Sequence, residues 1–183
     1  MSTDHASWHI KGDSILTELI AMMDLSAEET ATLGALQGAA RVHAPALLDA
    51  FYQRLLSHSN TAEYLQQASM DRLHTAVANW FTDLFSGNYN EQYAKKRLII
   101  GDVHVRIGLP VRYPLAMIDV IMPFGEQVAK TSATPDAAIK AFHKVLSLDI
   151  AIFNQAYEDN QLKHLAELVG GERLARLLLS GQG

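Results

Sequence analysis

The chain contains no cysteine, which excludes disulfide bonds, thiolate metal ligands and cysteine nucleophiles. Its basic residues form no run, and the net charge of −5 argues against nucleic-acid and anionic-membrane partners. No apolar stretch of about 18 residues could cross a membrane, and Met1 to Ile10 hold no apolar signal-peptide core. These absences predict a soluble protein of the cytoplasm.

Several enzyme motifs are missing as well. There is no glycine-rich phosphate loop, no GxSxG and no HExxH, and the pair Gly170-Gly171 is too short to replace them. No Glu-x-x-His pair could build a di-iron centre. Among the histidines only His5 and His9 have helical spacing, so a metal site at the N-terminus is a weak expectation.

The apolar residues recur at helical spacing, and no alternating valine–isoleucine run predicts a strand. We therefore expect an all-α protein with one domain of seven or eight helices. A capping box of Ser26 and Glu29 starts one helix, Pro45 suits the first turn of the next, and Gly170 ends the longest. The predicted helical segments are 15–23, 26–42, 45–56, 69–86, 90–107, 110–131, 134–169 and 172–179, with a short segment at 62–67 between the third and the fourth.

One histidine stands on an apolar face within a clearly ended helix. His104 shares its face with Ile100 and Ile107, and Gly108 and Pro110 end the helix that carries it. Such a histidine can bind the iron of a flat apolar cofactor. It can equally be a core histidine whose ring nitrogens are satisfied by the protein, and its spacing alone does not decide between them.

Tyr52 is the second candidate, because it lies in an apolar helix stripe with Phe51 and Leu55. Its ring should be buried, and its hydroxyl must then find a partner. A backbone carbonyl is the ordinary partner. A ligand bound to iron at His104 is the functional one.

Three segments together resemble a known family. Asp49-Ala-Phe-Tyr52, Met70-Asp-Arg-Leu73 and His104-Val-Arg-Ile-Gly-Leu-Pro110 are similar, in residues and spacing, to the globin domain of the globin-coupled sensors, which are bacterial haem proteins. The resemblance covers roughly residues 25–160. It implies a globin-like fold with an extra N-terminal helix and a long C-terminal helix, divided into an extension (1–24), a sensor globin domain (25–169) and a tail (170–183).

The resemblance also implies roles for individual residues. His104 corresponds to the proximal ligand of haem b, and Tyr52 to the distal tyrosine that donates to bound oxygen. Leu73 falls where other globins place a distal histidine, and His74, about 100° around the helix from it, is expected to face away. The remaining residues implied to line the pocket are Phe51, Ala76 and Ile107, with Lys96 and Arg97 as candidates for the haem propionates.

The function implied is that of a gas sensor and not of an enzyme. It would bind O2, CO or NO reversibly and signal through a dimer interface, a partner protein or an output domain. Tyr113-Pro114 departs from the Trp-Tyr of many members, which puts the signalling route in doubt. We expect a homodimer through the last two long helices; the alternative is that the same apolar stripe packs within one subunit. That stripe comprises Phe142, Val145, Leu146, Asp149, Ile152 and Phe153.

Two other functions remain open. A haem-dependent redox or nitric-oxide-detoxifying globin is the first, although no flavin region supplies electrons and Leu73 stands where a distal acid–base group would be expected. A haem-free globin-like interaction module is the second, although it would not need His104 or Tyr52.

Overall fold

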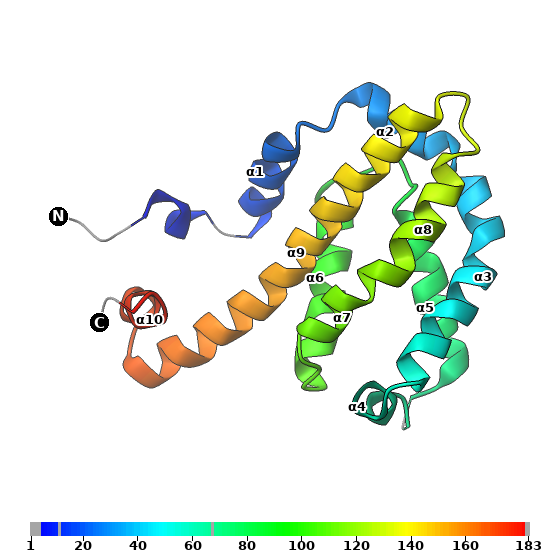
Figure 1. The fold of residues 1–183 in the computed structure, drawn as a ribbon. Helices are drawn as coiled ribbons and strands as arrows, with labels where there is room; N and C mark the ends of the chain where they lie inside the picture. The colour runs from blue at the N-terminus through cyan, green and yellow to red at the C-terminus, as the bar shows by residue number, and fades with distance from the viewer. Residues whose placement is uncertain (1–4, 11, 67, 182–183) are drawn as a thin grey trace.

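The computed structural model describes residues 5–10, 12–66 and 68–181, and every regular element in this part of the chain is a helix (Figure 1). The all-α prediction is therefore confirmed. The elements are η1 (Ala6–His9), α1 (Asp13–Met23), α2 (Ala27–Ala35), α3 (Gln37–Leu56), α4 (Ser59–Ala62), η2 (Glu63–Leu65), α5 (Met70–Asp83), α6 (Glu91–Arg106), α7 (Arg112–Ala116), α8 (Ile118–Ala129), α9 (Pro135–Val169) and α10 (Glu172–Leu179).

The sequence signals for helix ends are confirmed at several positions. Ser26 Oγ accepts a hydrogen bond from the Glu29 amide at 3.1 Å, and the Glu29 carboxylate accepts one from the Ser26 amide at 2.9 Å. Gly170 adopts a left-handed conformation with φ of 81° and ends α9, as glycine does at many helix C-termini. The start of α2 and the end of α9 therefore lie at the positions predicted from the sequence.

Proline was a poorer guide to the helix breaks. Pro45 lies inside α3, and the break predicted before it occurs instead at Leu36, between α2 and α3. Leu36 is 7% exposed and belongs to the core, so tertiary packing places this break. Pro123 likewise lies inside α8, and the predicted helix 110–131 is divided at Met117. Pro45 and Pro123 are both exposed, where water can satisfy the carbonyl that each leaves free.

α9 is the helix on which the others assemble: α2, α6 and α8 pack along it, while α3 packs against α5 and α8 (Figure 1). Phe142 of α9 is fully buried and stacks on Phe85, with ring centroids 5.4 Å apart. Val145, Leu146 and Ile152 are at most 2% exposed. The stripe expected at a dimer interface therefore packs within the subunit, which is the alternative stated above.

The second half of α9 extends beyond the bundle, and α10 folds back onto it (Figure 1). α1 packs against α9 and α6 on the same side of the molecule. None of the helices among the described residues is long and apolar enough to span a membrane.

Candidate functional site

α6 carries His104 and lies very close to α9. An added Cβ at Gly101 would come within 2.5 Å of Ala156 Cβ and 2.8 Å of the Phe153 carbonyl oxygen. The absence of a side chain at Gly101 thus allows this approach. One turn further on, the His104 ring meets the Phe153 ring edge-on, with centroids 5.3 Å apart.

The His104 imidazole has one ring nitrogen occupied and one available. Nδ1 lies 2.7 Å from the Ile100 carbonyl oxygen, and since a carbonyl can only accept, Nδ1 carries the hydrogen. Nε2 then has a free lone pair, and within the described residues no group bonds to it. Burial lowers the pKa of His104 from 6.5, against the opposing effect of the Ile100 hydrogen bond, so the ring is neutral at pH 7. This is the state of a histidine that ligates a metal.

Two tyrosines hold the loop that follows His104. Gly108, with φ of 70°, turns the chain out of α6. Tyr64 donates a hydrogen bond to the Gly108 carbonyl at 3.2 Å, and Tyr157 of α9 donates to the Leu109 carbonyl at 3.0 Å. Neither contact was predicted, because each joins segments more than forty residues apart in the chain.

Tyr52 on α3 is 6% exposed, yet its hydroxyl has no hydrogen-bond partner among the described residues. The other five tyrosines all lie in the described part, and each of their hydroxyls has a partner. Burial raises the pKa of the Tyr52 hydroxyl to about 12, so it remains a proton donor. The ordinary expectation of a backbone-carbonyl partner is therefore not met at this residue.

His74 does not face away from Tyr52, and that expectation was wrong. The two rings lie with their centroids 4.5 Å apart and their planes tilted by 53°. His74 precedes the fully buried Phe81 by seven residues, so both project from the same face of α5. The seven-residue spacing between His74 and Phe81 can be read from the sequence. The prediction, however, orients the helix from Leu73 alone.

Leu73 and Ala76 lie on the side of α5 that carries Trp80 and Asp83, at spacings of three and four residues. Asp83 accepts from Lys96 at 3.3 Å, which ties this side of α5 to α6. Ala76 is seven residues from Asp83, about 10 Å along the helix. Leu73 is half-buried and Ala76 exposed.

A buried carboxylate fastens α5 and α6 to α9. Asp149 of α9 is 3% exposed and accepts hydrogen bonds from Trp80 Nε1 at 3.0 Å, from the Tyr93 hydroxyl at 2.6 Å and from Arg97 Nε. Burial acts to lower the pKa of Arg97, but Asp149, Tyr93 and Asp83 together outweigh it and raise that pKa. The sequence places Asp149 in the apolar stripe of α9 but does not predict these three hydrogen bonds.

Arg97 is therefore not available to a propionate, contrary to expectation. It is 1% exposed and is bonded to Asp149 and, at 3.4 Å, to Asp83. Lys96 remains exposed, but its ammonium is paired with Asp83.

The predicted residues fall into two groups. Phe51 and Tyr52 contact each other edge-on, with centroids 5.4 Å apart, and His74 lies against Tyr52. His104 belongs to the α6–α9 layer, and no hydrogen bond or ring contact of the described residues joins it to Tyr52. Ile107, at the end of α6, is 50% exposed. Apolar side chains exposed near it in sequence are Val103 and Leu115.

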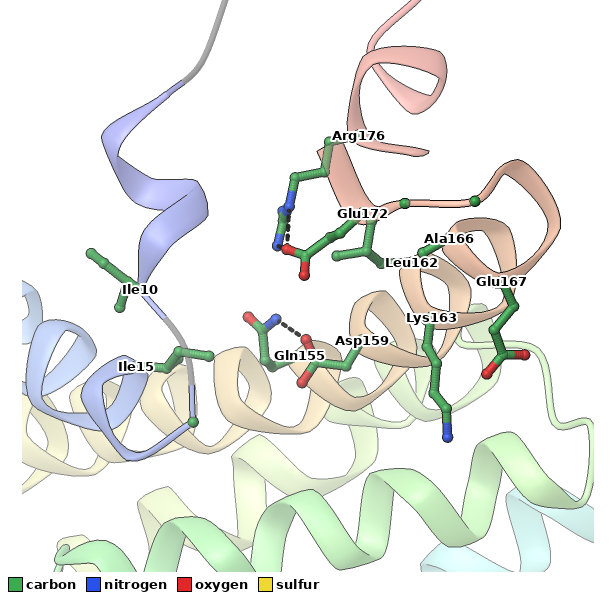
Figure 2. Close-up of a pocket in the computed structure, with 13 residues that line it drawn as sticks. Ile10, Ile15, Gln155, Asp159, Leu162, Lys163, Ala166, Glu167, Glu172 and Arg176 are labelled. Atoms are coloured by element: carbon green, nitrogen blue, oxygen red, sulfur yellow. Dashed lines mark hydrogen bonds and ion pairs between the residues drawn. The ribbon is translucent and has the colours of Figure 1, made fainter. Parts of the chain in front are cut away.

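A groove of about 590 Å³ lies elsewhere, between the N-terminal segment, the projecting half of α9 and α10 (Figure 2). Ile10, Ile15 and Leu162 give it an apolar side. Its polar side chains largely bond one another, as Gln155 does with Asp159 at 2.8 Å and Arg176 with Glu172 at 3.0 Å. None of the predicted site residues lines this groove.

Comparison with known proteins identifies the family of this chain. The family model described as Protoglobin matches residues 13–163. The chain is 26% identical to the "Heme-based aerotactic transducer HemAT" of Halobacterium salinarum, over 82% of this chain and 34% of that protein. It thus spans about a third of that relative's length.

A solved structure supports the same assignment. The globin domain of the Geobacter sulfurreducens globin-coupled sensor superposes with a TM-score of 0.71 and 27% identity, covering 77% of this chain and 96% of that one. The predicted globin-like fold is confirmed by this match. The chain belongs to the Protoglobin family and is a globin domain of the globin-coupled sensor type.

Proposed function

We propose that the chain is a haem-based gas sensor domain. The observation that carries the proposal is a pair of polar atoms with no hydrogen-bond partner among the described residues, His104 Nε2 and the Tyr52 hydroxyl. We propose that they face a haem from opposite sides. A neutral imidazole and a protonated phenol, both with apolar neighbours, fit haem b.

When bound, haem supplies an iron atom whose open position takes up O2, CO or NO reversibly. His104 would hold that iron through Nε2, while the Ile100 carbonyl fixes its tautomer and ring orientation. Leu73 has no atom that could ligate iron, so it would leave that side of the group free for a gas. Phe51, Ala76 and Ile107 would contribute apolar contacts around the group.

Tyr52 would determine the preference among the gases. Its hydroxyl donates a hydrogen bond, and O2 attached to ferrous iron is a better acceptor than CO. A net hydrogen bond of about 1–1.5 kcal/mol corresponds to roughly tenfold in affinity. Tyr52 therefore favours O2, and Ala76 offers no second donor.

A signalling role rather than catalysis is supported by the relatives, which are named as a transducer and a sensor. An output domain or partner protein would receive the signal. His74 favours the redox alternative, because it lies beside Tyr52 and could serve as a distal acid–base group. We nevertheless place sensing first, because His74 contacts the ring of Tyr52 and both relatives are named for signalling.

We further propose that the chain forms a homodimer through α9 and α8, using a surface other than the buried stripe. Leu168, on the projecting half of α9, is 84% exposed, and Met122 of α8 is 36% exposed. Sedimentation should give the mass of two chains, and Leu168→Glu should reduce it. An unchanged single-chain mass would contradict this surface.

The decisive experiment is an absorption spectrum of the purified protein, first ferric, then reduced under argon, then mixed with O2. We expect a Soret band that is lost in His104→Ala and regained when imidazole is added. His164→Ala is the matched control, because His164 is an exposed histidine on the projecting half of α9. If added haem gives no Soret shift, the haem proposal is wrong and the haem-free module takes its place.

A further inference from the structure

His74 has no role in the proposed gas binding, although its ring contacts the ring of Tyr52. Tyr52 has ring contacts with two residues in the described part of the chain: Phe51 at 5.4 Å and His74 at 4.5 Å. Phe51 is the preceding residue of α3, so it moves with Tyr52. His74 comes from α5, and it is the ring that fixes Tyr52 relative to another helix.

We propose that His74 is a positioning residue: its imidazole packs against the Tyr52 ring and sets the direction of the Tyr52 hydroxyl. The inference deepens the proposed function and rests on it. It makes His74 a determinant of gas discrimination without requiring contact between His74 and the gas.

The first side-chain torsion of tyrosine places the phenol oxygen, and the second sets the ring plane in which the O–H bond lies. The second torsion is broad unless neighbours restrict the ring. A tilted ring at 4.5 Å supplies such a restriction. The Tyr52 hydroxyl has no hydrogen bond in the described residues that could fix it instead. Ring packing is therefore what remains to hold this donor in place.

His74 is itself well supported. α5 packs against α3, and Phe81, seven residues after His74 on the same face, is fully buried. The His74 imidazole makes no hydrogen bond within the described residues, so its contribution is one of packing. A flat ring of similar size should replace it.

The test is infrared spectroscopy of the carbon-monoxide complex, since the C–O stretch reports the position of a distal donor. In His74→Ala the band should broaden and move toward that of Tyr52→Phe, and O2 should dissociate about two- to tenfold faster, the range of an aromatic pair. His74→Phe should restore both properties. The double variant His74→Ala/Tyr52→Phe should match Tyr52→Phe alone, because His74 acts through Tyr52.

The same contact can be measured without haem. In urea unfolding of the haem-free protein, the losses caused by His74→Ala and Tyr52→Leu should be less than additive in the double variant. A Soret band with an unchanged C–O band in His74→Ala would overturn this inference and leave the haem function standing. Failure of His74→Phe to restore the band would also overturn it. Absence of any Soret band in the unmutated protein would overturn both proposals.

Discussion

The guanidinium of Arg97 donates a hydrogen bond to the carboxylate of Asp149, and the two side chains are almost completely buried. This pair joins α6, which carries His104, to α9. Trp80 and Tyr93 also donate hydrogen bonds to the same carboxylate. The helix that carries His104 is thus fastened to the longest helix by charge and hydrogen bonds as well as by apolar packing.

Removal of one partner should be costly, because the other charge is left buried. We expect Arg97→Met to lower the free energy of unfolding by about 3–5 kcal/mol, measured by urea denaturation. Arg97→Met/Asp149→Leu should lose less than Arg97→Met alone. Asp102→Asn, at an exposed position on α6, is the control and should change little. Equal losses for the single and double variants would show that the charge pair is not the cause.

Gly101 should tolerate no larger side chain. A Cβ there would meet Ala156 and the backbone of Phe153, so Gly101→Val must push α6 from α9. We expect a loss of about 1–3 kcal/mol in unfolding free energy and weaker retention of haem, measured by transfer to an apo-globin acceptor.

Gly38 provides the matched control for this substitution. It also lies in a helix, but an added Cβ would meet nothing within 4 Å. Gly38→Ala should therefore stabilise the protein by up to about 1 kcal/mol. A Gly101→Val protein as stable as the unmutated one would contradict the close approach.

The distal donor should be insensitive to moderately alkaline pH. Burial raises the pKa of Tyr52 from 10 to about 12, so the hydroxyl keeps its proton where a free tyrosine begins to ionise. The C–O stretch of the carbon-monoxide complex should stay constant between pH 7 and about 10. A shift toward the Tyr52→Phe frequency in this range would mean that Tyr52 ionises normally.

The same shift affects stability in a definite direction. The folded protein holds the Tyr52 proton more tightly than the unfolded chain, so stability is full below pH 10 and falls as the pH rises toward 12. Burial also raises the pKa of Tyr157 to about 12, so that residue contributes to the same fall. Tyr52→Phe should make the decline shallower, as followed by urea denaturation at pH 9 to 11.

The tyrosines that bind the loop after His104 should act on haem retention more than on the fold. Tyr157→Phe removes the hydrogen bond to the Leu109 carbonyl and should cost about 1 kcal/mol of stability. Haem loss should quicken, because the loop that ends α6 is less firmly held. Tyr113→Phe is the control, since the Tyr113 hydroxyl has only a 3.4 Å contact from exposed Arg112. Equal haem loss in both variants would remove Tyr157 from this role.

Local signals predicted much of the fold. The capping residues Ser26 and Glu29, the glycine that ends α9 and the helical spacing around His104 each depend on neighbouring residues, which the sequence displays directly. The break at Leu36 could not be predicted in this way. Gly34 and Gly38 flank it without marking the break, which occurs because α2 packs against α9 while α3 packs against α5 and α8.

For the candidate site, His104 and Tyr52 are predicted from their apolar faces and from a family resemblance, and both stay predictions. The contact of His74 with Tyr52 was missed because α5 was oriented from Leu73, although Phe81 gave the better reference. The role of Arg97 was missed because its partner Asp149 lies 52 residues away in sequence.

The bonds between α5 and α6 are unevenly distributed along the two helices, and this has a kinetic consequence. Asp83 holds Lys96 and Arg97, while Ala76 and His104 each lie seven residues, about 10 Å of helix, from those contacts. The end of α5 that bears Ala76 can therefore move relative to His104 while the hydrogen bonds of Asp149 to Trp80, Tyr93 and Arg97 stay closed. Cofactor exchange and complete unfolding should then cross separate barriers, so that one rate can change without the other.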